Sequence, residues 1–117
     1  MHDTDDEGLL RRQRHFLLGI DRDIRTINRR ILHERLPDLD RSSVVDLAEK
    51  VAELRANYLA LALELSCRPL SEIDGADIRR VGEARGLYDE GRAAFSALER
   101  AIERGYIDLP DDGSAPG

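Results

Sequence analysis

The feature that most constrains the fold is a run of apolar residues between positions 44 and 65, spaced alternately by three and four. This spacing keeps the residues on one side of an α-helix and is incompatible with the two-residue period of a strand. The seam consists of Val44, Leu47, Val51, Leu54, Tyr58, Leu61 and Leu65. Because this is the spacing of coiled-coil-like packing, we predict a helix over 43–66 that packs lengthwise against another helix.

Apolar residues also predict a helix over 9–35, the first in the chain, and a helix over 72–104, the third. The seam of the first helix is Leu10, Leu17, Ile20, Ile24, Ile27 and Ile31. The apolar face of the last is Ile73, Ile78, Val81, Leu87, Tyr88, Phe95, Leu98 and Ile102. Pro37 should end the first helix, because proline disfavours helical geometry in the residue before it. Gly105 stands where glycine commonly ends a helix.

Two sequence signals concern the ends and the interior of these helices. Ser43 with Asp46, and Ser71 with Asp74, have the spacing of a capping box, so we expect the second and third helices to begin there. The third helix contains Gly82, Gly86 and Gly91. Each glycine weakens a helix interior by about 1 kcal/mol, and we predict one helix with a weak point, either kinked there or closely approached by another backbone.

The 117 residues match a single domain. We expect a flexible acidic N-terminus over 1–8, one helical-bundle domain over 9–106 and a flexible tail over 107–117. Short turns between long helices favour an all-α, antiparallel, up-down-up three-helix bundle.

The apolar surface exceeds what three helices cover among themselves. Between Ala56 and Leu65 only Asn57 and Glu64 are strongly polar, and near Gly19 two apolar residues flank the seam instead of lying on it. Since most soluble oligomers are symmetric, we predict a homodimer that forms a larger helical bundle. Its expected interface is Phe16, Leu17, Leu18, Ile20, Tyr58, Leu59, Leu61 and Leu63. The N-terminal segment, the segment 106–109 or a different protein are the alternative covers.

Charge is unevenly distributed along the chain. The net charge is −6, yet residues 9–36 carry eight arginines against three acidic residues. Such a basic segment is typical of a surface for an anionic partner, and the candidate face is Arg22, Arg25, Arg29 and Arg30. The alternative is that these arginines pair with the acidic ends or with the neighbouring helices.

We predict no catalytic, cofactor or metal site. His15 and His33 lie 18 residues apart, which separates them by about 27 Å on a helix, so one metal ion cannot bind both. Asp74 and Asp77 stand at a helix start, where carboxylates favour the helix dipole. The single cysteine, Cys67, excludes an internal disulfide and a multi-cysteine zinc site.

Two short segments resemble phosphorelay proteins. The segment His15–Gly19 is similar to the His-x-Leu-Lys-Gly stretch of histidine phosphotransfer domains but lacks the lysine, and the segment His33–Pro37 resembles the phosphoacceptor box of sensor kinases. Those families imply a role for His15 or His33. Each match covers about five residues, and we carry no functional role across from it.

The favoured function is therefore a non-catalytic protein–protein interaction module, an adaptor, chaperone or regulatory subunit. The alternatives are a histidine phosphotransfer or other small bundle enzyme, and an arginine-led nucleic-acid-binding regulator, which the pI of about 5.0 disfavours. The longest apolar run is Tyr58–Leu63, far short of the roughly 20 residues that a membrane span needs. We accordingly expect a cytoplasmic protein with no membrane contact.

Overall fold

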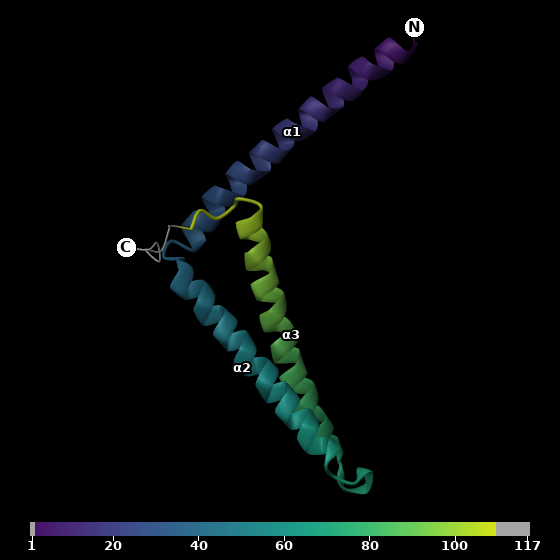
Figure 1. Cartoon of the computed structure of the whole chain (residues 1–117), viewed down its shortest axis with the longest axis vertical. Coiled ribbons are helices and arrows are strands. Elements are labelled where there is room, and N and C mark those ends of the chain that lie inside the picture. Colours follow the sequence, from purple (N-terminus) through teal and green to yellow (C-terminus); the bar gives the residue numbers. More distant parts are fainter. Residues whose placement is uncertain (1, 110–117) are drawn as a thin grey trace, which may run out of the picture. The chain divides into compact units, whose positions relative to one another are not determined.

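The computed structural model describes residues 2–109, with side chains from residue 5 onward (Figure 1). These residues form three α-helices, α1 (His2–Arg35), α2 (Arg41–Ser66) and α3 (Gly75–Glu103), with a short 3-10 helix, η1 (Leu70–Glu72), between the last two. The described part of the chain contains no strand, so the all-α prediction is confirmed. Of the tail that we expected to be flexible, residues 110–117 lie outside the described residues.

The chain divides into two compact units, a division that the sequence did not predict. One unit joins the residues up to 38 with residues 101–108, and the other contains residues 39–100. The first unit therefore holds α1, and the second holds α2 with most of α3.

Helix α1 is longer than expected at its N-terminus. It begins at His2 instead of Leu9, so residues 2–8, part of the end that we expected to be flexible, are helical. The physical reason is the acidic cluster that includes Asp5, Asp6 and Glu7, because carboxylates stabilise the positive end of the helix dipole. The helix ends at Arg35 as predicted, with Leu36 N–H still donating to the Leu32 carbonyl at 2.7 Å.

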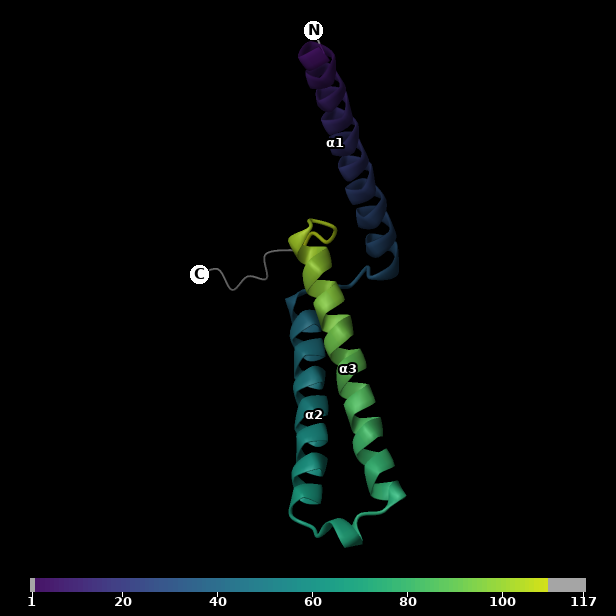
Figure 2. The same ribbon diagram turned by 90° about the vertical axis from the view of Figure 1, so that its right-hand side faces the viewer.

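Helices α2 and α3 lie side by side as an antiparallel hairpin (Figure 2). All seven predicted seam residues of α2 are buried or half-buried, and Val51 is only 8% exposed. On α3 the residues Val81, Ala84, Tyr88, Gly91, Phe95 and Leu98 are buried or half-buried, and Tyr88 and Gly91 contact α2 directly. The prediction for α3 is wrong at Ile78 and Leu87, which are exposed.

Small residues hold α2 and α3 close together. Ala84, at 3%, is the least exposed described residue, and a Cβ atom added to Gly91 would lie 3.0 Å from Leu54 Cδ1. By contrast, nothing lies within 4 Å of a Cβ added to Gly82 or Gly86. Helix α3 is continuous through all three glycines, and the atoms that approach Gly91 belong to the Leu54 and Val51 side chains instead of to another backbone.

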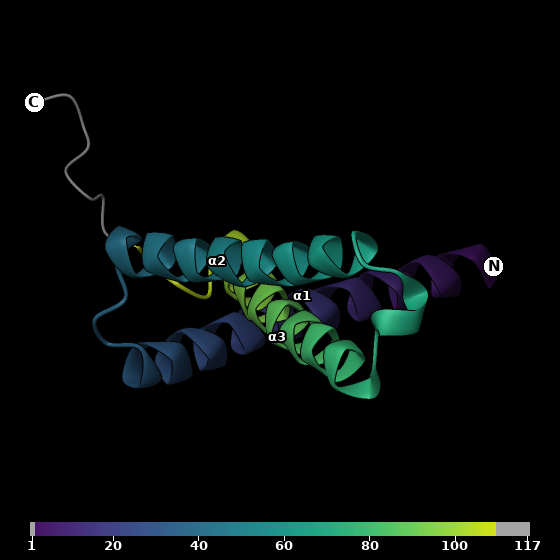
Figure 3. The ribbon, with the colours of Figure 1, turned by 90° about the horizontal axis from the view of Figure 1, so that it is seen from below.

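Both predicted N-caps are displaced by three residues. Helix α2 is capped by Asp40, whose carboxylate accepts hydrogen bonds from the Ser43 N–H and hydroxyl, each at 2.9 Å. Helix α3 follows Asp74 instead of Ser71. The reason in the second case is that Ile73 is extended, which separates η1 from α3. The turn that contains η1 joins α2 to α3 (Figure 3).

The C-terminal end of α3 matches the expectation for Gly105. This glycine has φ +75°, a left-handed conformation that side chains other than glycine rarely adopt. Its N–H donates to the Ile102 carbonyl at 3.0 Å, and the Tyr106 N–H donates to the Ala101 carbonyl at 2.9 Å. This pair of hydrogen bonds is a Schellman motif.

Candidate functional site

The principal candidate for an interaction surface is the apolar seam of α1. Its six side chains are 38–60% exposed. The seam consists of Leu10, Leu17, Ile20, Ile24, Ile27 and Ile31. Because a single helix cannot bury its own apolar stripe, the first unit offers this seam to a further surface.

Segment 101–108, the other part of the first unit, contacts the arginine side of α1. The Arg29 guanidinium lies 3.6 Å from the Asp108 carboxylate. A Cβ atom added to Gly105 would lie 3.9 Å from Arg25 Cδ. Within the candidate anion-binding face, Arg29 therefore pairs with an acidic residue near the C-terminal end, which was the alternative to an anionic partner. Arg22 and Arg30 of the same face are exposed.

The predicted interface residues separate into two groups. Phe16, Leu17, Leu18 and Ile20 are all exposed, as an interface requires, with Phe16 at 65%. The sequence could identify them because they lie on or beside an otherwise regular seam.

The remaining four predicted interface residues lie on opposite sides of α2. Tyr58 and Leu61 are half-buried on the α3-facing seam, so they are not part of a free surface. Leu59 and Leu63 are exposed on another side of the helix. The apolar period placed Tyr58 and Leu61 both on the α2 seam and in the predicted dimer interface. Their packing against α3 assigns them to the seam.

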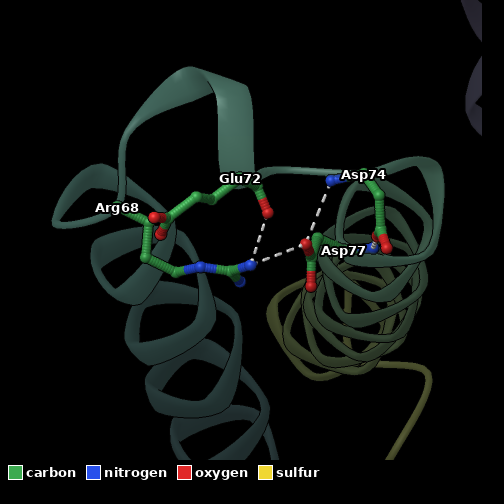
Figure 4. Close-up of polar contacts among 4 residues, drawn as sticks. All are labelled: Arg68, Glu72, Asp74 and Asp77. Atoms are coloured by element: carbon green, nitrogen blue, oxygen red, sulfur yellow. Dashed lines mark hydrogen bonds and ion pairs between the residues drawn. The ribbon is translucent and has the colours of Figure 1, made fainter.

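A polar cluster at the turn end of the hairpin is drawn in Figure 4. The Nη2 atom of Arg68 donates to the Glu72 carbonyl at 2.7 Å and also lies 3.1 Å from Asp77 Oδ2. The same Asp77 oxygen accepts from the Asp74 N–H at 3.1 Å, and the Asp77 N–H donates to Asp74 Oδ1 at 3.0 Å. Asp74 and Asp77 therefore form a reciprocal capping box, which confirms that these carboxylates cap a helix.

The electrostatics of this cluster match a structural role. The hydrogen bond from Arg68 lowers the pKa of Asp77, helped by the Asp74 N–H, and the same contact raises the pKa of Arg68. The Asp77 side chain is 12% exposed. The cluster thus ties the end of α2, η1 and the start of α3 together through a charged pair. Asp74 and Asp77 could be recognised from their spacing at a helix start, whereas Arg68 could not, because its partner lies across a turn.

A second cluster links α2 and α3 along their length. The rings of Tyr58 and Tyr88 are stacked with centroids 6.1 Å apart. Arg55 Nε donates to the Tyr88 hydroxyl at 3.2 Å, and the guanidinium carbons of Arg55 and Arg92 lie 5.4 and 5.6 Å from the Tyr88 ring centroid. These contacts give Tyr88 partners on both helices, so it stabilises the hairpin.

The histidines and the cysteine whose side chains are described remain apart. His15 and His33 are exposed positions of α1, and Cys67 is an exposed free cysteine at the end of α2. Among the described residues, no three histidine, cysteine or acidic side chains come together in a way that could hold a metal ion.

No family model, curated protein or solved structure matches the chain. Within residues 2–109, no helix has both the length and the apolar character to cross a membrane.

Proposed function

We propose that this chain is a non-catalytic protein–protein interaction module that works as a homodimer and serves as an adaptor, chaperone or regulatory subunit. The observation that supports it is the open aliphatic seam of α1, with six side chains 38–60% exposed. Amphipathic helices gain most of their stability by packing such a stripe. A contiguous exposed apolar surface of this kind is typical of an interaction site.

The hairpin supports the same proposal. Val51 and Ala84 are the buried residues of the described chain, so the α2–α3 contact alone provides a thin core. The outer side of α2 adds exposed Val45, Leu59 and Leu63. A second apolar surface that covers these residues would therefore stabilise the hairpin.

We infer that the assembled protein is a helical bundle in which the three helices run up, down and up and in which two copies join. The antiparallel α2–α3 pair accounts for two of these helices. Residues 36–40 connect α1 to α2, and a connection of that length commonly joins antiparallel neighbours.

Substituting one seam residue tests the proposal. Sedimentation equilibrium should give the wild type twice the 13.2 kDa mass of one chain. Ile24→Glu should shift the protein toward that single mass, because a carboxylate in a closed apolar seam loses its hydration.

The matched control is Thr26→Glu, which adds the same charge to the same turn of α1 outside the seam. It should retain the dimeric mass. A wild type that sediments as one chain at every concentration would contradict the proposed homodimer, and equal effects of the two substitutions would contradict the assignment of the seam.

A further inference from the structure

We infer that the second copy binds through α1 itself, with the two α1 helices antiparallel along their full length. This inference rests on the proposed homodimer. It adds the surface that makes the contact, the direction of the pairing and its register.

The register follows from the seam and from the ends of the helix. When His2 of one copy lies opposite Arg35 of the second copy, the two helices overlap from end to end. In this register Leu17 lies opposite Ile20 of the second copy, and Leu10 lies opposite Ile27 of the second copy. Because the two kinds of seam position face one another in an antiparallel pair, complete overlap pairs four of the six seam residues with one another, while Ile24 lies opposite Gln13 and Ile31 opposite Asp6.

Charges beside the seam favour this arrangement. Arg14 of each copy lies on the flank of the seam beside Asp21 of the other, two residues from the directly opposed position, so two-fold symmetry gives two attractive pairs. In addition, the acidic residues 5–7 of each copy face the stretch around Arg29 and Arg30 of the other. Complementary charges of this kind select among arrangements that bury similar apolar surfaces.

The competing arrangements bring like charges together. Sliding the antiparallel pair by seven residues in one direction places Asp21 against Asp21 of the second copy, and sliding it by seven residues in the other direction places Arg14 against Arg14 of the second copy. A parallel pair aligns all six seam residues with their own copies, but it places Arg30 beside Arg35 and the acidic residues 5–7 beside one another. The apolar seam accepts both directions, and the charges select the antiparallel one.

Disulfide trapping with single cysteines tests the direction. Cys67 is exposed and free, so the parent protein for this experiment carries Cys67→Ser. Leu10→Cys and Ile27→Cys are made separately in that parent, then oxidised alone and as an equimolar mixture. In the antiparallel pair the two copies of Leu10→Cys lie about 25 Å apart along the axis, far beyond the reach of a disulfide.

The inference requires a disulfide-linked heterodimer in the mixture and none in either variant alone. A parallel pair would instead link each variant to itself, which would overturn the inference. A parent that is dimeric by sedimentation but gives no disulfide in any sample would also overturn it and leave the proposed homodimer intact. A monomeric parent would overturn both.

Charge exchange provides an independent measurement of the register. Arg14→Asp should weaken the dimer by roughly three- to tenfold in Kd, because two attractive pairs become repulsive. Arg14→Asp combined with Asp21→Arg should restore the affinity. The control is Arg12→Asp, which makes the same charge change away from the seam; a loss of affinity equal to that of Arg14→Asp would count against the register.

Discussion

At the scale of single residues, the charged side chains with the most defined surroundings are at helix starts. Asp40 accepts hydrogen bonds from Ser43, and Asp77 from Arg68 and the Asp74 N–H. The pKa of Asp40 and the pKa of Asp77 are both lowered by these hydrogen bonds. Their ionised forms are therefore part of the folded state, and the stability of the protein should depend on pH in the acidic range.

The expected pH dependence has a definite sign. Since the pKa of each aspartate is lower in the folded than in the unfolded chain, the unfolded chain binds more protons in acid. The stabilisation should be complete above the unfolded pKa of about 3.9 and should be lost as the pH falls below it. Urea unfolding at a series of pH values should show this loss.

Asp77→Asn provides the comparison for this pH series. It should be less stable than the wild type at neutral pH, because Arg68 loses its charged partner, and its stability should fall less on acidification. Identical pH profiles for Asp77→Asn and the wild type would exclude Asp77 as a source of the dependence.

At the scale of helices, α3 shows how one residue type has different effects along one element. Gly86 has open space where a side chain would begin, whereas Gly91 lies against Leu54 and Val51 of α2. The first glycine only weakens the helix, and the second permits close packing of the hairpin.

Substitutions in α3 should separate these effects. Gly86→Ala should raise the free energy of unfolding by about 0.5–1 kcal/mol, since alanine is the better helix former. Gly91→Val should lower it by roughly 1–3 kcal/mol, because its branched side chain overpacks the α2 contact. Chemical denaturation monitored by circular dichroism measures both changes.

Gly82→Ala is the control for helix propensity, because nothing lies within 4 Å of the new Cβ. It should behave like Gly86→Ala. If Gly91→Val were as stable as the wild type, the close contact between α2 and α3 would be wrong.

At the scale of the whole molecule, each compact unit leaves apolar surface for another surface to cover. The first unit exposes the α1 seam, and the second exposes Leu59 and Leu63 on α2. Association through these surfaces would couple folding to dimer formation, as in other proteins whose subunits complete one another's cores.

This coupling predicts a thermal midpoint that depends on concentration. The Tm of the wild type should rise as the protein concentration rises, because the folded dimer is favoured by mass action. The Tm of Ile24→Glu should be lower and independent of concentration. Calorimetry at several concentrations measures both, and a wild-type Tm that does not change with concentration would argue against coupled association.

Local patterns along the chain were sufficient to predict three helices, the α2 seam, the end of α1 before Pro37 and the glycine end of α3. Each of these depends on hydrogen bonds or side-chain periods within a few residues of the same helix. The α1 seam and the exposed Phe16 and Leu18 could be recognised for the same reason.

Tertiary packing decided the features that depend on residues far apart in sequence. On α3, Gly91 lies against Leu54 and Val51 and Ala84 is buried, whereas Ile78 and Leu87 of the expected apolar face are exposed. Tyr58 belongs to the hairpin because Tyr88 stacks on it. The apolar period shows that a helix has a covered side, but the size and position of the opposing side chains determine which residues occupy it.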